Sequence, residues 1–511
     1  MCGILLHFNP NTENLEDEYV EVFEPQLIGT STISSSNKST IVHRLIPNIT
    51  QRGPNFLSLR SKKEYGITWV SSVLSLRKPF TKQSVEANSR YIIQYNGELY
   101  GDEIVDNDTK YITSLLQQNT VEDVVRGLSG EFAYSIFDQQ SRLLYFGRDP
   151  IGKRSLSYKL DHDTGELYVS SVSGRIEGFE NCVAGVIYTF DTSKLILSKE
   201  TKIREADYMV SAAVEDISSI DKYADRLYEQ LVCAVRQRLT TIEPVQDVQD
   251  NHVAVLFSGG LDCTTIAAII CEQSRDHSNY VVELLNVAFE NPRTGMQPCE
   301  APDRLLAVKS AKTLQELYPE VNIKLVKIDV PYDDYLQYRD TVIDMIFPKD
   351  TEMDLSIAIA FYFASRGQGY LEDRGERFPY QRNALVLFSG LGADELYGGY
   401  HKLANKSNEE LVIELSRQIN NIHDRNLNRD DKVIACHGVE ARYPFLDQDV
   451  VDLSTQLPIN YKINKMVLRN IASRRLQLSE ISCEPKRAIQ FGAKSAKMTK
   501  DGNKHGTDRL K

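Results

Sequence analysis

The stretch VAVLFSGGLD (residues 253–262) decides how the second half of the chain folds. Its first five residues form a short apolar run, which indicates a strand that is buried on both faces. A glycine-containing turn follows, and Thr264 to Cys271 then has the composition of a helix. Glycines let a backbone approach phosphate closely, and the free N–H groups at the start of a helix bind anions. The stretch therefore predicts a strand–turn–helix unit that can bind phosphate.

Strands and helices alternate on both sides of this stretch. Apolar residues recur at helical spacing from Ile220 to Leu239, which predicts a long amphipathic helix. Further buried strands are expected at Val282 to Phe289, Ile323 to Ile328 and Ala384 to Phe388, and Glu290 to Pro302 is expected to be a loop. This alternation is typical of an α/β fold, a doubly wound parallel sheet with helices on both faces.

Residues before about 205 follow a different pattern, with short strands that end at turn signals. The expected strands are Tyr91 to Gln94, Phe132 to Phe137, Leu143 to Phe146, Leu167 to Ser170 and Val186 to Phe190. Short helices are expected at Thr109 to Leu116 and Val121 to Leu128. Such strands indicate stacked antiparallel sheets. Because the pattern changes between residues 205 and 215, we predict two domains, residues 2–210 and 211–511.

The composition narrows the class of protein. The chain has 511 residues, of which 41% are hydrophobic and 25% charged, as in ordinary globular proteins. A net charge of −12 argues against nucleic acid as a partner. No apolar run approaches the roughly 18 to 20 residues that cross a membrane, and the first residues do not resemble a signal peptide. Eight scattered cysteines without a CxxC pair are typical of a reducing compartment. We therefore expect a cytoplasmic protein; its oligomeric state does not follow from the sequence.

Cys2 is the first candidate for chemistry. It follows Met1, and its small side chain would allow that methionine to be removed. The thiol would then lie beside a free α-amine, whose pKa of about 7.7 to 8.0 suits a general base. A cysteine in this position can equally be a buried thiol at the end of a strand.

Five later segments support the chemical interpretation of Cys2. They are QRGPN (residues 51–55), NGELY (96–100), DNDT (106–109), LSGEFA (128–133) and GRDPIG (147–152). In this order they resemble the glutaminase domain of class II glutamine amidotransferases, which has the αββα fold of N-terminal nucleophile (Ntn) hydrolases. The resemblance implies that Cys2 attacks the side-chain amide of glutamine and releases ammonia. Asn96 and the N–H group of Gly97 would form the oxyanion hole. The substrate would be held by Arg52, Glu98 and Asp108, with the two carboxylates on its α-ammonium.

This first domain departs from the family pattern at Val73. The family has an arginine there, which binds the α-carboxylate of glutamine. Arg77 is close by and would face the same way in an extended strand, but the sequence does not say whether it substitutes. Asn55 also replaces the aspartate of the family's RGPD segment. Asn96-Gly97 is in addition a strong hairpin-turn signal, so we expect the strand from Tyr91 to end there.

Two segments extend the SGGLD pattern in the second domain, FSGLGADELYGGY (residues 388–400) and VEARYPFLD (439–447). Together they resemble the synthetase domain of asparagine synthetases, which has a pyrophosphate-loop ATPase fold. With the first domain, the resemblance covers nearly the whole chain. It implies that ATP is cleaved to AMP and pyrophosphate while a carboxylate such as aspartate is adenylated, and that ammonia then attacks the acyl-adenylate. The overall pattern is most similar to the asparagine synthetase domain-containing proteins, a divergent branch of this family of carbon–nitrogen ligases.

The resemblance also implies site residues in the second domain. ATP would be held by Phe257, Ser258, Gly259, Gly260, Asp262, Val287, Ser389 and Gly390. Asp262 and Asp394 would bind Mg²⁺. Lys486 would stabilise charge on the reacting groups, with Arg487 and Lys494 as alternatives. Arg442 and Asp447, in contrast, are expected to form an internal ion pair.

The second domain departs from the family pattern at two positions. Leu391 replaces the glutamate that acts as the base for ammonia, and leucine can neither accept a proton nor bind an ammonium ion. Cys263 replaces the first serine after the loop aspartate. Three hypotheses therefore stay open: a glutamine-hydrolysing asparagine synthetase, a ligase that acts on another carboxylate, or a non-catalytic relative that binds ATP or a protein partner.

Overall fold

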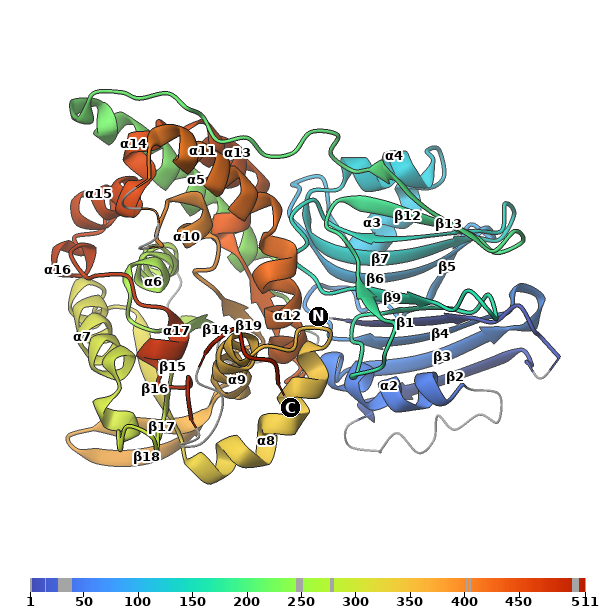
Figure 1. Cartoon of the computed structure of the whole chain (residues 1–511), viewed down its shortest axis with the longest axis horizontal. Coiled ribbons are helices and arrows are strands. Elements are labelled where there is room, and N and C mark those ends of the chain that lie inside the picture. Colours follow the sequence, from blue (N-terminus) through green and yellow to red (C-terminus); the bar gives the residue numbers. More distant parts are fainter. Residues whose placement is uncertain are drawn as a thin grey trace.

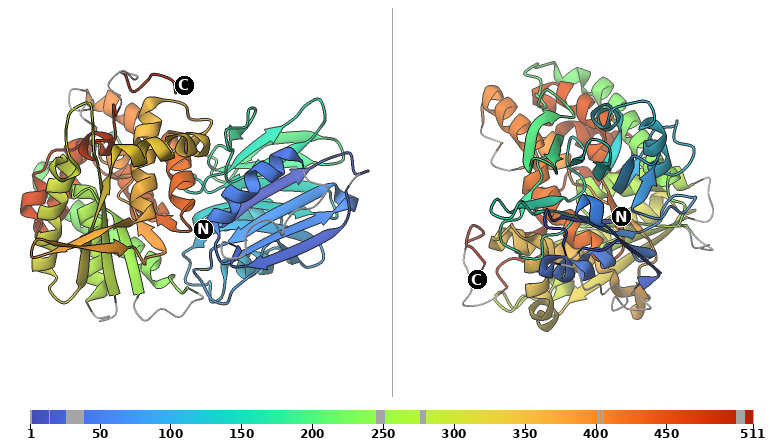
Figure 2. Two further views of the ribbon diagram at one scale, coloured as in Figure 1. Left: turned by 90° about the horizontal axis from the view of Figure 1, so that it is seen from below. Right: turned by 90° about the vertical axis from the view of Figure 1, so that its right-hand side faces the viewer.

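The computed structural model describes residues 2–13, 15–25, 39–244, 251–275, 280–400, 403, 406–498 and 505–510. The N-terminal part contains two stacked sheets, and the C-terminal part is built around a third sheet beside them (Figures 1 and 2). The predicted boundary at residue 210 lies between the last strand of the second sheet and the first long helix of the C-terminal part. Among the described residues, no helix has the length and apolar character needed to span a bilayer.

Every strand pairing in the first two sheets is antiparallel, as the turn-bounded strands predict. The first sheet has the order β11-β9-β10-β1-β4-β3-β2 and the second β13-β12-β8-β7-β6-β5. The strands of the first sheet are β1 (Gly3–Phe8), β2 (Glu18–Phe23), β3 (Phe56–Lys62), β4 (Ile67–Val73), β9 (Ser157–Leu160), β10 (Leu167–Ser170) and β11 (Glu180–Asn181). Those of the second are β5 (Val85–Ala87), β6 (Tyr91–Leu99), β7 (Gly130–Asp138), β8 (Leu143–Arg148), β12 (Val186–Asp191) and β13 (Ile196–Lys202).

Helices cover the outer faces of these two sheets. An apolar layer that contains Trp69 and Phe137 fills the space between the sheets. α2 (Thr40–Arg52) packs its apolar side on the first sheet, while α3 (Asp108–Leu115) and α4 (Val121–Gly127) pack on the second. The predicted αββα arrangement is therefore confirmed.

The third sheet has the order β18-β17-β16-β15-β14-β19-β20. Its strands are β14 (Asn251–Leu256), β15 (Tyr280–Phe289), β16 (Asn322–Val330), β17 (Gln368–Asp373), β18 (Glu376–Gln381), β19 (Val386–Phe388) and β20 (Glu440–Arg442). β14, β15, β16 and β19 run parallel, as predicted. β20, which was not predicted, pairs parallel with β19. β17 and β18 form an antiparallel hairpin that the sequence analysis missed. Its turn is Arg374-Gly375, where both residues have positive φ, and this pair is a weaker turn signal than Asn-Gly.

Helices flank the third sheet on both sides. α5 (Ile220–Thr240) packs on α6 (Leu261–Ser274), which contacts β14, β15 and α7 (Pro302–Leu317). α9 (Glu352–Arg366) packs against β14, β15 and β16 and is itself covered by α8 (Tyr332–Ile346) and α12 (Asn428–Ala435). The other helices of this part are α10 (Ala393–Leu396), α11 (Asn408–Asn420), α13 (Gln448–Gln456), α14 (Ile459–Lys462), α15 (Met466–Arg474), α16 (Ser479–Ser482) and α17 (Ile489–Gly492).

The strand order places the predicted motifs beside one another. From β14 the chain adds β15 and β16 on one side, and then returns to add β19 and β20 on the other side. In open α/β sheets, ligands bind at the carboxyl ends of the strands where the order reverses in this way. The loops after β14 and β19, which carry SGGLD and SGLGAD, meet at this point.

Candidate active sites

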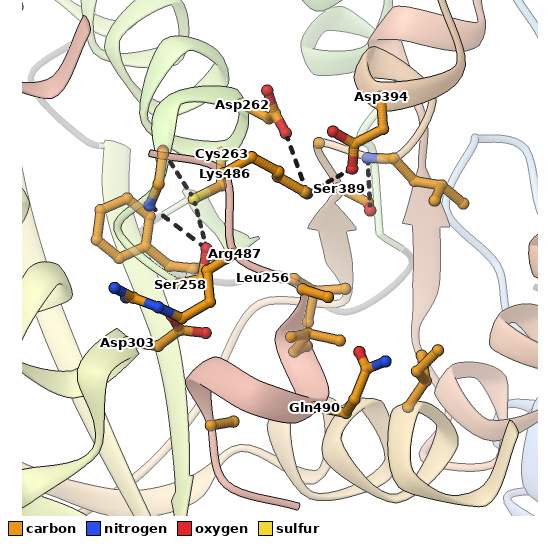
Figure 3. Close-up of a pocket in the computed structure, with 18 of the residues that line it drawn as sticks. Leu256, Ser258, Asp262, Cys263, Asp303, Ser389, Asp394, Lys486, Arg487 and Gln490 are labelled. Atoms are coloured by element: carbon orange, nitrogen blue, oxygen red, sulfur yellow. Dashed lines mark hydrogen bonds and ion pairs between the residues drawn. The ribbon is translucent and has the colours of Figure 1, made fainter. Parts of the chain in front are cut away.

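A cavity of about 260 Å³ lies at the carboxyl ends of β14 and β19. The predicted nucleotide-binding residues Phe257 and Val287 line it. So do five residues from the two loops: Ser258, Gly260, Asp262, Ser389 and Gly390 (Figure 3). Gly259 does not line the cavity. Its φ is +79°, and a Cβ there would overlap the backbone of Ala307, so glycine is required for packing. The N-terminus of α6 faces the cavity with no side-chain cap among the described residues, which leaves its N–H groups open to an anion.

Two carboxylates in this cavity share two lysines. Lys465 Nζ lies 2.6 Å from Asp262 Oδ2 and 2.5 Å from Asp394 Oδ1. Lys486 Nζ contacts Asp394 and lies 3.8 Å from Asp262 Oδ2 (Figure 3). Burial alone would raise the pKa of Asp394, but Lys465 and Lys486 lower it to about 2. The pair of carboxylates is therefore arranged to hold positive charge between them.

Leu391 lines the same cavity, where it presents an apolar side chain packed against the core. Its N–H group donates to Ser389 Oγ (3.2 Å). Nearby, Glu395 accepts hydrogen bonds from Tyr400 Oη (2.6 Å) and Asn426 Nδ2 (2.9 Å). Both bonds reach Oε1, and Oε2 is buried without a hydrogen-bond partner among the described residues. Glu395 therefore positions two lining residues from behind the cavity wall and does not itself line the cavity.

Cys2 lies just before β1, in a second cavity of about 40 Å³. Its N–H group donates to Asn96 Oδ1 (2.8 Å). Asn96 Nδ2 is buried and has no hydrogen-bond partner among the described residues, so this donor is free for a ligand. Burial raises the pKa of the Cys2 thiol. A thiol of this kind depends on a nearby base to become a nucleophile.

The expected turn at Asn96-Gly97 is wrong. β6 continues through both residues to Leu99, and Asn96 pairs with Ala133 and Gly97 with Phe132 on β7. Pairing with β7 keeps both residues extended, so the chain does not turn here. Gly97 is required for a steric reason, because a Cβ would overlap the carbonyl oxygen of Glu131.

Arg77 lies in the Cys2 cavity, but not in the way the sequence suggested. β4 ends at Val73, so Arg77 does not continue a strand and does not share the facing of Val73. Val73 packs with Cys2, Phe56 and Phe80 in an apolar cluster. Arg77 Nη1 instead forms an ion pair with Asp108 and lies 3.4 Å from Glu98 Oε1. Burial raises the pKa of Asp108 to about 6, although Arg77 acts in the opposite direction.

Comparison with known proteins shows the family of the chain. A sequence model described as asparagine synthase matches residues 228–414 and 405–510, and one described as a glutamine amidotransferase domain matches residues 75–177. The chain is 57% identical to asparagine synthetase domain-containing protein YML096W of Saccharomyces cerevisiae, over 100% of this chain and 99% of that protein. The chain belongs to the asparagine synthase family. Human asparagine synthetase domain-containing protein 1 is 28% identical over 90% of this chain and 93% of its own. Chicken asparagine synthetase [glutamine-hydrolyzing] is 25% identical over 79% and 72%.

Membership of the asparagine synthase family confirms the resemblance in both domains. The structure adds Lys465, which the sequence analysis missed. Lys465 precedes α15 with a φ of +59° and lies next to Asn464, which also has positive φ. Nothing in the sequence separates it from neighbouring lysines, because its partners are more than 60 residues away in the chain. Of the alternatives to Lys486, Arg487 lines the cavity beside Asp303 (3.7 Å), whereas Lys494 does not line it.

A buried network of ion pairs joins the two parts of this asparagine synthase family member. Its members, none more than 3% exposed, are Arg52, Glu98, Glu131 and Arg154 from the first domain and Arg238, Asp431, Glu440 and Arg442 from the second. Arg154 lies at its centre, 3.3 Å from Glu131, 3.6 Å from Glu440 and 3.9 Å from Asp431. The four arginines balance the four carboxyl groups, and opposite charges face each other across the interface.

This network corrects two expectations. Arg52 does not line the Cys2 cavity; it lies behind Cys2, donates to the Cys2 carbonyl oxygen (3.2 Å) and pairs with Asp431 (2.9 Å). The predicted pair between Arg442 and Asp447 is also wrong. Arg442 pairs with Glu440 (2.8 Å) and Glu98 (3.4 Å), while Asp447 caps α13 and pairs with Arg238 (2.9 Å). Arg442 points from β20 toward the other domain, which is why its partners are distant in sequence.

Proposed function

We propose that this member of the asparagine synthase family is an AMP-forming amide ligase. The C-terminal cavity binds ATP and adenylates a carboxylate, and ammonia released from glutamine at Cys2 converts the acyl-adenylate into an amide. The observation that carries the proposal is the pair Asp262 and Asp394, held together by two lysines beside the uncapped N-terminus of α6. Aspartate is the simplest acceptor, and its product is asparagine.

The residues of the C-terminal cavity suit a nucleotide. The triphosphate would lie over the Ser258–Gly260 turn and the first N–H groups of α6, with the nucleoside toward Phe257 and Val287. Asp262 and Asp394 already bind lysine ammonium groups between them. The same carboxylates would bind Mg²⁺, which would neutralise charge on the leaving pyrophosphate. Lys465 and Lys486 would then be free to pair with phosphate oxygens.

The proposed reaction proceeds in two steps. An oxygen of the acceptor carboxylate attacks the α-phosphorus of ATP, and pyrophosphate leaves. Ammonia then attacks the acyl carbon, AMP leaves, and the surplus proton passes to solvent. Leu391 offers no base for this proton, and a positioned base typically contributes about 10²- to 10⁴-fold. We therefore expect slow amide formation with aspartate as the acceptor.

The N-terminal site would supply the ammonia. After removal of Met1, the α-amine of Cys2 accepts the thiol proton while sulfur attacks the amide carbon of glutamine. Asn96 Nδ2, which has no partner among the described residues, and the N–H group of Gly97 would stabilise the oxyanion. Ammonia leaves, and water hydrolyses the thioester to glutamate. The free position of Asn96 Nδ2 is the observation that supports this half of the reaction.

A second candidate function is ATP binding without turnover. Leu391 favours it, because the cavity keeps its carboxylates and lysines but lacks a proton acceptor at that position. The two candidates make different predictions for the products formed from ATP.

The test uses intact protein with ATP, Mg²⁺, glutamine and aspartate, and measures ATP binding, AMP, pyrophosphate and glutamate. We expect ATP to bind and AMP and pyrophosphate to be released slowly. Release of both products should be lost in Asp394→Asn and retained in the exposed control Asp340→Asn. Binding without AMP, for aspartate and a panel of other carboxylates, would favour the second candidate. Absence of ATP binding would exclude both. The intact mass shows separately whether Met1 is removed, which glutaminase action by Cys2 requires.

A further inference from the structure

We propose that Arg77 binds the α-carboxylate of glutamine at Cys2, and that in the free protein its guanidinium is held by the carboxylates that receive the substrate's α-ammonium. The proposal rests on the glutaminase half of the proposed function. It assigns the role of the arginine that is missing at position 73 to Arg77, which lies in the loop after the end of β4.

The charges around the Cys2 cavity lead to Arg77. Within the described lining, the carboxyl groups belong to Glu98, Asp108 and Glu440, and the cation is Arg77. Glu440 is already paired with Arg442 (2.8 Å) and Arg154 (3.6 Å). A free amino acid has both an ammonium and a carboxylate, and each needs an opposite charge when it is buried. Arg77 is therefore the lining residue that can bind the carboxylate.

Other nearby positions do not offer a cation. Val73 is enclosed in the apolar cluster with Cys2, Phe56 and Phe80. Arg52 is buried behind Cys2, where it holds the Cys2 carbonyl and Asp431. Arg442 is fully buried and donates to Thr241 (2.6 Å) and Glu440 (2.8 Å). Moving either of these arginines would break the network between the domains.

Arg77 differs from its partners in how firmly it is held. Glu98 belongs to the paired strand β6, and Asp108 begins α3 and accepts a hydrogen bond from Leu99 N (3.1 Å). Arg77 lies outside any helix or strand, between β4 and β5, and its side chain is 13% exposed. The carboxylates are thus fixed, whereas the guanidinium can swing aside on a flexible side chain.

The α-ammonium and α-carboxylate of an amino acid, here called its head, can bind between Arg77 and the two carboxylates without leaving a charge unpaired. In the free protein, Arg77 and Asp108 neutralise each other directly. When the zwitterionic head enters, its carboxylate pairs with Arg77 and its ammonium pairs with Asp108 and Glu98. One ion pair is replaced by two, and the net charge of the cavity does not change. The planar guanidinium also suits two parallel hydrogen bonds to a carboxylate.

The test compares two reagents that modify Cys2. The first, 6-diazo-5-oxo-L-norleucine, carries the amino-acid head of glutamine. The thiol proton passes to its diazo carbon, the Cys2 sulfur bonds to that carbon, and nitrogen gas leaves. The second, iodoacetamide, has no such head; its carbon bonds to the Cys2 sulfur, and iodide and the thiol proton are lost. Mass spectrometry of the N-terminal peptide follows both reactions, on protein whose intact mass shows that Met1 is absent.

We expect the diazo reagent to label wild-type Cys2, and Arg77→Ala to lower its labelling rate about a hundredfold, the value for one or two lost charged hydrogen bonds. Iodoacetamide should label Arg77→Ala at least as fast as wild type, which shows that Cys2 is intact. Arg77→Lys should recover part of the loss, and the surface control Arg126→Ala should behave like wild type.

Two results would overturn the proposal. Unchanged or faster labelling of Arg77→Ala by the diazo reagent would mean that Arg77 does not bind the head. Failure of wild type to react with the diazo reagent while iodoacetamide reacts would mean that the cavity takes no amino acid. Calorimetric binding of L-glutamine gives the same comparison for protein that retains Met1. None of these readouts depends on AMP formation, so failure of the synthetase reaction is distinguishable from failure of the Arg77 assignment.

Discussion

Lys465 and Lys486 are the residues whose replacement tests the proposed reaction most directly. Both pair with Asp262 and Asp394, although one precedes α15 and the other lies between α16 and α17. Because each carboxylate has two lysine partners, removal of one lysine leaves both carboxylates paired. A change in activity would therefore report on charge stabilisation during the reaction more than on folding.

Replacement of Lys465 by methionine should lower the rate of AMP formation by about 10²- to 10³-fold, the usual loss for one stabilising group. Lys494→Met is the matched control, because Lys494 does not line the cavity. The measurement is the initial rate of AMP release at saturating ATP. Retention of full activity by Lys465→Met would show that Lys465 does not stabilise charge during the reaction.

Replacement of Leu391 by glutamate should increase activity. Leu391→Glu places a proton acceptor in the wall of the cavity, and we expect aspartate-dependent amide formation to rise about 10²-fold. Leu391→Gln has nearly the same shape but cannot accept a proton at neutral pH, so it serves as the control. Equal rates for both variants and wild type would show that a missing base does not limit the reaction.

The pKa of Asp108 predicts how glutamine binding depends on pH. Burial raises this pKa to about 6, and only the ionised carboxylate can pair with the substrate's ammonium. The contribution of Asp108 to affinity should therefore be complete above about pH 7 and be lost as the pH drops through about 6, as protons compete for its carboxylate. Calorimetric titrations with glutamine across this interval test the expectation. A constant dissociation constant between about pH 5 and 7.5 would contradict it.

At the scale of elements, β20 is the strand that separates the two sites. Arg442 accepts a hydrogen bond from Ser389 N (3.0 Å) through its carbonyl, and its side chain approaches Glu98 (3.4 Å). Glu440 lines the Cys2 cavity and pairs with Arg154 of the other domain. This short strand is therefore held on one side by the sheet and on the other by buried ion pairs.

Arg154 is the central cation of that interface, and its loss should be costly. Arg154→Met leaves Glu131, Glu440 and Asp431 without a shared partner, and breaking a buried ion pair on one side costs about 3 to 5 kcal/mol. Arg204→Met removes a partly exposed pair with Asp452 and should cost less than about 1 kcal/mol. Chemical unfolding followed by tryptophan fluorescence and circular dichroism compares the variants. Equal stabilities would show that the buried network does not hold the domains together.

The sequence predicted elements well where local patterns decide them. The strand ahead of SGGLD, the long helix from Ile220 and the short strands of the first domain all occur close to their expected residues. The predicted end of the strand at Asn96-Gly97 was wrong because pairing with β7 overrides the local turn preference of this dipeptide. Lys465, and the partners of Arg77 and Arg442, depend on contacts between segments that are far apart in the chain. Periodicity and local motifs contain no signal for such contacts.

For the whole molecule, the two cavities have no lining residue in common among the described residues. The space between them is occupied by β20 and the buried network, whose eight charges belong equally to both domains. This arrangement fixes the position of the Cys2 cavity relative to the cavity at the carboxyl ends of β14 and β19. The two proposed half-reactions can therefore be measured separately in one intact protein.

We propose that the cavity at the carboxyl ends of β14 and β19 cleaves ATP between its α- and β-phosphates. The most direct measurement supplies intact protein with Mg²⁺, aspartate, ammonium and ATP labelled in the α-phosphate, and separates the labelled nucleotides by chromatography. We predict labelled AMP, formed together with an equal amount of pyrophosphate and abolished by Asp394→Asn. Labelled ADP as the product, or no binding of ATP by the wild-type protein, would mean that this cavity does not adenylate a carboxylate.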